Sequence, residues 1–188
     1  MLRRQFLTTA AAVALYFAAR PALALTMDNA KALVDALVAD IARASGTADF
    51  EGLFKRYADV PGIAGYVLGL DGRNASAAQK RDFQEAFTGY VARKYGPRLR
   101  DFTGGRIEVT EVRQVKSFHE VSCSAHLPGA APQALDFTVS DAGGRELIFN
   151  LKIGGVNLLL TERTEIGSMI DRRGGDLDAM IADLRGAG

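Results

Sequence analysis

The pattern of hydrophobic and polar positions is most distinctive in residues 147–170. Two strongly apolar runs, residues 147–153 and 156–160, flank the pair Gly154-Gly155, an arrangement typical of a β-hairpin. The second run contains three consecutive leucines, where a half-exposed strand would alternate with polar residues. We therefore predict a hairpin that forms the floor of a hydrophobic cavity.

Helical spacing of apolar residues dominates the part of the chain before this hairpin. Residues 28–44 place their apolar side chains on one face, and a second helix is expected to start at Thr47. Pro61 opens a third, short helix, because its fixed dihedral suits a first turn. Gly65 and Gly69 are unusual within it, since glycine costs about 1 kcal/mol relative to alanine in a helix. Close packing or a helix end would account for them.

The strongest helix signal lies in residues 76–95. Ser76 and Gln79 form a capping box at its start, and Gly96-Pro97 ends it. One face is formed almost entirely of aromatic residues: Phe83, Phe87, Tyr90, Val91 and Tyr95. This stripe predicts either a packed aromatic core or the wall of a cavity.

The period changes from helical to strand-like after residue 105. Three strands are expected near residues 106–116, 121–127 and 135–140, with a bulge in the first because its valines break strict alternation. Helical spacing returns at Glu165 and is interrupted near Gly174. The sequence thus predicts an α+β fold in which helices pack on one face of a curved, mainly antiparallel sheet and enclose a hydrophobic pocket.

The first residues are typical of a cleaved export signal. Arg3-Arg4 precede an uncharged run that is shorter than the about 20 residues needed to span a bilayer, and small residues at 22–24 suit signal cleavage. The paired arginines are similar to a twin-arginine signal. We expect residues 1–24 to be removed and residues 25–188 to form one exported domain.

Composition and motifs exclude several function classes. A formal net charge of +1, which stays near neutral without the signal arginines, argues against nucleic-acid binding. Cys123 is the only cysteine, so the chain forms no internal disulfide. His119 and His126 are expected on opposite faces of one strand, where they do not share a metal. No catalytic motif is present, and we predict a protein without cofactor that is not an enzyme.

Three blocks of sequence, in this order and spacing, resemble a known family. They are Val67-Leu68-Gly69 with Arg73 and the aromatic helix after Ser76; the hairpin from Ile153 to Leu158; and Arg163 with the helical tail to Leu184. On these residues the chain resembles the MlaC family of exported phospholipid-binding proteins of the toluene-tolerance type. Gly72 and Ile166 stand where that family commonly has aromatic residues.

The resemblance implies a periplasmic shuttle. Such a protein carries phospholipid between an outer-membrane lipoprotein complex and an inner-membrane ABC transporter complex, and so helps to maintain the lipid asymmetry of the outer membrane. A hopanoid-associated carrier, as in one branch of the family, is an alternative.

The residues expected to contact the acyl chains are large and apolar and lie on faces predicted to point inward. They are Val67, Leu68, Phe83, Phe87, Tyr90, Phe137, Phe149, Val156, Leu158 and Leu160.

Two readings from other classes remain open at the level of sequence. One is a small cone-shaped enzyme, such as an isomerase, with Asp136, Tyr90 and His119 as candidate acids or bases. The other is an exported interaction domain with a solid core. The presence or absence of a cavity distinguishes the latter from a carrier.

Overall fold

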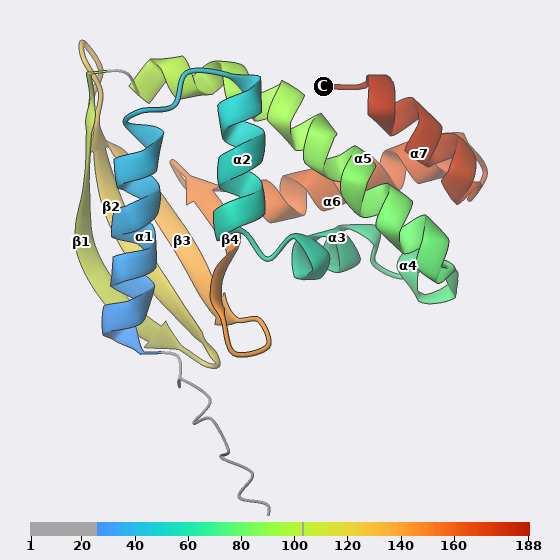
Figure 1. Cartoon of the computed structure of the whole chain (residues 1–188), viewed down its shortest axis with the longest axis horizontal. Coiled ribbons are helices and arrows are strands. Elements are labelled where there is room, and N and C mark those ends of the chain that lie inside the picture. The colour runs from blue at the N-terminus through green and yellow to red at the C-terminus, as the bar shows by residue number, and fades with distance from the viewer. Residues whose placement is uncertain (1–25, 103) are drawn as a thin grey trace, which may run out of the picture.

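An open sheet of antiparallel strands, in the order β1-β2-β3-β4-β5, forms one end of the molecule (Figure 1). The computed structural model describes residues 26–102 and 104–188, so the predicted signal at residues 1–24 lies outside the described residues. The strands are β1 (Arg106–Val115), β2 (Phe118–His126), β3 (Gln133–Asp141), β4 (Glu146–Ile153) and β5 (Val156–Asn157). The α+β class predicted from the sequence is confirmed.

Helices make up the rest of the described chain. They are α1 (Met27–Ile41), α2 (Thr47–Tyr57), α3 (Val60–Leu68), α4 (Asp71–Asn74), α5 (Ala77–Tyr95), the 3-10 helix η1 (Gly96–Phe102), α6 (Leu158–Arg172) and α7 (Leu177–Gly186). Within residues 26–102 and 104–188, none of these is long and apolar enough to cross a membrane.

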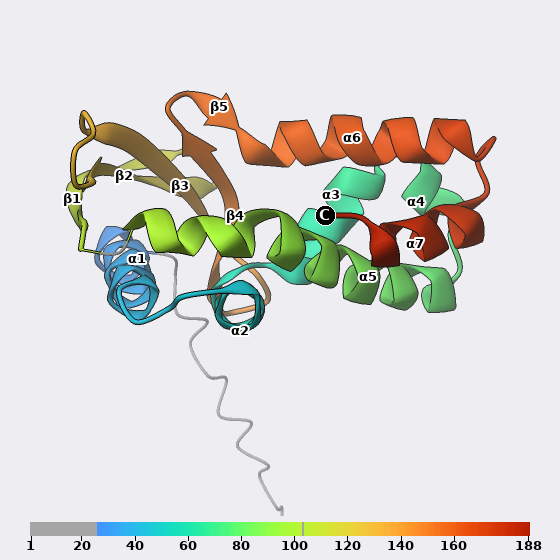
Figure 2. The same ribbon diagram turned by 90° about the horizontal axis from the view of Figure 1, so that it is seen from above.

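The molecule has two hydrophobic cores, one at each end. The sheet core joins α1 to β2, β3 and β4 through residues such as Val34, Val121 and Val139. The helical core joins α3, α5, α6 and α7 through residues such as Phe83 and Ile166. Figure 2 shows α5 running from the sheet end to the helical end and α6 running beside it. These two long helices connect the cores.

A β-bulge in β4 divides its side chains between the cores. Val139 of β3 pairs with Ile148, whereas the preceding Thr138 pairs with Asn150, so Phe149 is the extra residue. Ile148 therefore belongs to the sheet core, while Phe149 packs against the helical core. Strict alternation predicts Leu147 and Phe149 on the face of Leu151, and this is wrong because the bulge places Ile148 there.

The free edge of β4 is covered at the same point. Ala58 forms an isolated bridge with Ile148, and the backbone N–H of Asp59 donates to the Ile148 carbonyl at 2.9 Å. The Asp59 side chain then caps α3 by accepting from the Gly62 N–H at 3.0 Å. The start of the helical end is thus fixed to the edge of the sheet.

The prediction of a full second strand in the hairpin, over residues 156–160, is wrong. Only Val156 and Asn157 are extended, and α6 begins at Leu158. Asn157 caps this helix, because its side-chain oxygen accepts from the Leu160 N–H at 3.1 Å. The three leucines therefore occupy the first helical turn and point in different directions, as 3.6 residues per turn requires.

Other local predictions are confirmed. Ser76 and Gln79 form the capping box of α5, and β1 has a register shift between Val109 and Glu111. Gly69 ends α3 with φ of 58°, and a Cβ there would lie 2.7 Å from the Arg163 guanidinium. One expectation is wrong: the family resemblance implies that Arg163 lies near the end of the last strand, but Arg163 lies within α6 and donates to the Tyr66 carbonyl at 2.8 Å.

The Asn157 cap gives a test of where α6 begins. Replacing Asn157 by Ala is expected to lower the free energy of unfolding by about 1 kcal/mol, because the Leu160 N–H loses its acceptor. Urea denaturation measures this change. Asn157→Asp should restore most of it, and the exposed Ser168→Ala on the same helix should change it by less than about 0.5 kcal/mol. An unchanged midpoint in Asn157→Ala would contradict this helix boundary.

Candidate functional site

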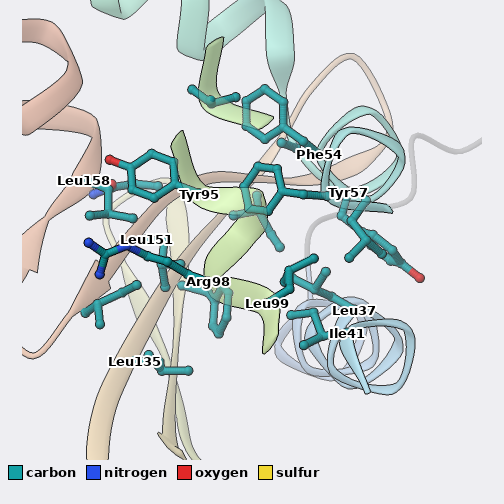
Figure 3. Close-up of a pocket in the computed structure, with 18 of the residues that line it drawn as sticks. Leu37, Ile41, Phe54, Tyr57, Tyr95, Arg98, Leu99, Leu135, Leu151 and Leu158 are labelled. Atoms are coloured by element: carbon teal, nitrogen blue, oxygen red, sulfur yellow. The ribbon is translucent and has the colours of Figure 1, made fainter. Parts of the chain in front are cut away.

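A cavity of about 330 Å³ lies where the two cores meet (Figure 3). Its volume falls within the roughly 300–1,000 Å³ that is typical of small-molecule pockets. The apolar lining comes from the inner face of the sheet and from α1, α2, α5, η1 and α6, and includes Leu37, Ile41, Phe50, Leu53, Phe54, Phe87, Val91, Leu99, Leu135, Phe137, Ile148, Phe149, Leu151, Ile153, Leu158 and Leu159. A cavity of this composition favours an aliphatic ligand.

α2 supplies one wall of the cavity. Phe50, Leu53, Phe54 and Tyr57, the residues at helical spacing on its apolar face, all line it. Every one of them is only partly buried by protein, and none of the α2 side chains is fully buried. α2 thus packs only part of its apolar face against neighbours, such as Phe54 against Phe87, and presents the rest to the cavity, as Figure 3 shows for Phe54 and Tyr57.

The exposed polar residues of the lining mark the mouth of the cavity. Arg98 and Asp101 lie on η1, and Gln133 lies at the start of β3. Arg98 stands among aromatic and aliphatic side chains in Figure 3. Within the described residues Arg98 forms no ion pair or hydrogen bond, including with Asp101. The mouth therefore carries a guanidinium that is available to a ligand.

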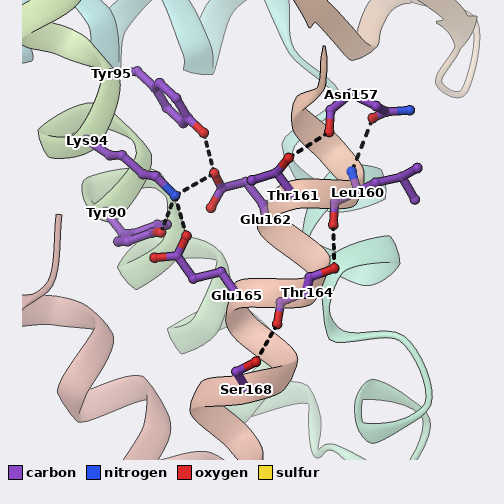
Figure 4. Close-up of polar contacts among 10 residues, drawn as sticks. All are labelled: Tyr90, Lys94, Tyr95, Asn157, Leu160, Thr161, Glu162, Thr164, Glu165 and Ser168. Carbon is purple, nitrogen blue, oxygen red and sulfur yellow. Dashed lines mark hydrogen bonds and ion pairs between the residues drawn. The ribbon is translucent and has the colours of Figure 1, made fainter. Parts of the chain in front are cut away.

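A partly buried polar cluster joins α5 to α6 beside the cavity (Figure 4). Its members are Tyr90, Lys94, Tyr95, Glu162 and Glu165. The Lys94 ammonium donates to Oε1 of Glu162 at 2.9 Å, to Glu165 at 2.5 Å and to the Tyr90 hydroxyl at 2.8 Å. The Tyr95 hydroxyl donates to the same Oε1 of Glu162. Glu162 is only 4% exposed and lines the cavity.

Burial and hydrogen bonding shift the proton affinities of this cluster. Burial raises the pKa of Tyr90 and Tyr95 above the ordinary tyrosine value, and their carboxylate neighbours add to the effect. Burial alone would lower the pKa of Lys94, but hydrogen bonds to Glu162 and Glu165 raise it overall. The cluster is therefore held as neutral tyrosines around an ammonium–carboxylate pair.

The predicted acyl-chain residues fall into three groups. Phe87, Phe137, Phe149 and Leu158 line the cavity. Val67, Leu68, Phe83 and Tyr90 are buried in the helical core and lie outside the lining, although Leu68 and Phe83 border a second hollow between α3 and α5. Val156 and Leu160 are 55% and 49% exposed. The last two differ from expectation: Val156 lies in the two-residue strand β5, and Leu160 lies in the first turn of α6, which begins earlier than the predicted helix.

Several lining residues were not anticipated from the sequence. Leu99 and Phe102 lie on η1, which continues the path of α5 after Gly96-Pro97 where the sequence indicates a stop. Glu162 lies on α6, in the segment between the predicted second strand of the hairpin and the helix predicted from Glu165. The apolar residues of α2 lie at helical spacing in the sequence, and their partial burial in the structure is the signal that they face a cavity.

The residues of the enzyme alternative lie outside the cavity lining. Asp136 accepts from the Ser122 hydroxyl at 2.7 Å on the other face of the sheet, His119 is buried near the start of β2, and Tyr90 is buried in the helical core. In residues 26–102 and 104–188 no group of three potential metal ligands is found. Cys123 is buried in the sheet core, where burial raises the pKa of its thiol to about 11.

Comparison with known proteins agrees with this architecture. The family model described as MlaC protein matches residues 28–186. The chain belongs to the MlaC family. The solved structure of a phospholipid-binding protein from Ralstonia solanacearum, in complex with a phospholipid, has the same fold: the TM-score is 0.69 at 20% identity, over 84% of this chain and 97% of that one. No curated protein matches the sequence.

The raised pKa values of the polar cluster predict alkaline destabilisation of this MlaC-family protein. Tyrosine and lysine release protons near pH 10.0 and 10.5 in the unfolded chain but hold them in the folded protein. Stability is therefore complete below pH 10.0 and falls as the pH rises above it, by up to about 1.4 kcal/mol per pH unit for each group.

Urea denaturation at neutral pH and at about pH 11, one unit above the tyrosine value, measures this slope. Tyr95→Phe removes one titrating group, so its stability should fall less steeply than that of the wild type. Parallel pH profiles for the two proteins would show that Tyr95 does not contribute.

Proposed function

We propose that this protein is a phospholipid carrier that holds the acyl chains of its lipid in the cavity between α2, α5 and the sheet. The observation that carries the proposal is the cavity itself: about 330 Å³ of apolar space that opens at Arg98, Asp101 and Gln133. Membership of the MlaC family and the fold shared with a phospholipid-bound protein support it. Phe87, Phe137, Phe149 and Leu158 are the predicted residues that would contact the chains.

Physical chemistry explains why such a cavity suffices for transport. Burial of a methylene is worth about 0.8 kcal/mol, so an acyl chain of about 15 methylenes faces a barrier on the order of 12 kcal/mol in water. Inside an apolar cavity the acyl chain stays out of contact with water during transfer, so this barrier does not arise. A carrier of this kind needs no catalytic group, and the headgroup remains at the polar mouth.

The proposal includes the cellular setting. The protein would be exported by its twin-arginine-like signal, function as a single domain from residue 25 in the periplasm, and pass phospholipid between an outer-membrane lipoprotein complex and an inner-membrane ABC transporter complex. This transfer would help to maintain the lipid asymmetry of the outer membrane. The support is the family and the pattern of residues 3–24.

Two leucines in the first turn of α6 provide a matched test. Leu158 lines the cavity, whereas Leu160 is 49% exposed on the same turn. Leu158→Arg should reduce lipid retention by about tenfold or more, because an unpaired charge in an apolar site costs several kcal/mol. Leu160→Arg should retain lipid at the wild-type level.

Native mass spectrometry after incubation with phospholipid vesicles measures the lipid bound to each protein. Thermal melting of both variants confirms that they are folded. A wild-type protein that takes up no lipid would overturn the proposed function. Uptake by Leu158→Arg equal to that of Leu160→Arg would overturn the assignment of the lipid to this cavity.

A further inference from the structure

The second hollow lies at the helical end of the molecule and is separate from the cavity. Residues of α3, α4 and α5, which lie together at that end in Figure 1, line about 330 Å³ of space. This size is at the lower limit of small-molecule pockets. Phe83 lines the second hollow, whereas its stacking partner Phe87 lines the cavity, and no residue lines both. The second hollow is therefore a distinct space.

The second hollow combines an apolar floor with a positively charged rim. Ala64, Leu68 and Phe83 are buried at its floor. Arg73 and Lys80 are exposed, line it, and form no ion pair with any residue that the structure describes. No carboxylate is found among the described residues of its lining. Such a surface attracts a molecule that joins an apolar group to a negative charge.

Gly65 in the lining is not explained by the fold. It lies inside α3, where glycine is unfavourable relative to alanine. Of the two reasons expected from the sequence, a helix end accounts for Gly69, whose φ is 58°. Neither reason applies to Gly65, because a Cβ there would meet no atom within 4 Å and its φ lies outside the left-handed region. The missing side chain of Gly65 instead keeps the second hollow open.

We propose that the second hollow binds a small amphiphilic anion, a carboxylate or phosphate that carries one short alkyl chain. The chain lies over Gly65 and against Leu68 and Phe83. Arg73 and Lys80 bind the anionic group through charge-assisted hydrogen bonds. The site is independent of the proposed carrier function, because the second hollow and the cavity share no residue.

Titration of isotope-labelled protein with sodium octanoate tests this site by NMR. Amide signals of residues 64–73 and 80–84 report the second hollow, whereas those of Leu135 and Phe137 report the cavity. Octanoate should bind at the second hollow about fivefold more tightly than octanol, which has the same chain and no charge, because exposed ion pairs contribute modestly. The preference should shrink as the salt concentration rises.

Two glycine variants form a matched pair. Gly65→Leu fills the second hollow and should lower octanoate affinity there by about tenfold or more, because the alkyl chain loses its space. Gly167 in α6 is equally open but lines neither space, so Gly167→Leu should bind octanoate as the wild type does. Each variant replaces a helical glycine, so neither should melt below the wild type.

A second pair tests the charged rim. Lys80→Gln should weaken the binding of octanoate at the second hollow and leave that of octanol unchanged, because only octanoate carries a charge. The neighbouring Arg81 is exposed on the same helix and lies outside the lining, so Arg81→Gln should change neither affinity.

Octyl phosphate should bind at the second hollow as octanoate does, whereas inorganic phosphate alone should leave its signals unchanged. Signals that shift only in the cavity, equal binding of octanoate and octanol, wild-type affinity in Gly65→Leu, or an equal response to inorganic phosphate would each overturn this site. All four results leave the carrier function in place, since phospholipid uptake from vesicles tests that function separately.

Discussion

The bulge at Phe149 is the constraint on which the rest of the structure depends. A regular β4 would direct alternate residues to one face of the sheet and could serve only one core. The extra residue sends Ile148 to the sheet core and lets Phe149 pack against Tyr66 of α3, with ring centroids 5.9 Å apart. At Ile148, beside the bulge, the edge of β4 pairs with the α2–α3 junction. One strand thus determines how the two ends of the molecule are joined.

The cavity follows from this division. Each core buries its own set of apolar residues, and α5 and α6 belong to the helical core and run toward the sheet end (Figure 2). The Lys94–Glu162 pair fixes the distance between these helices at the cavity wall, which opposes collapse of the space. Such a buried pair contributes more to geometry than to net stability, because desolvation offsets most of its attraction.

Local signals in the sequence were sufficient for most elements and insufficient for the cavity. Capping residues and apolar spacing predicted α1 and α5, and the broken alternation of β1 predicted its bulge. The start of α6 was missed because Asn157 and three leucines suit both a strand end and a helix start. The ability of Asn157 to cap a helix was the signal in the sequence that could have located the start of α6. The lining of the cavity depends on which apolar faces are only partly covered after folding, as α2 illustrates, and periodicity does not contain that information.

The burial of Cys123 has a practical consequence. As the only cysteine in the chain, held deep in the sheet core with a pKa of about 11, it is a poor nucleophile at neutral pH and is shielded from other molecules. The natural protein therefore resists linkage into disulfide dimers in an oxidising compartment. A cysteine introduced at the mouth, for instance at the exposed Gln133, would be the one accessible thiol. Fluorescent or spin labels attached there could report loading of the cavity without any change to the native core.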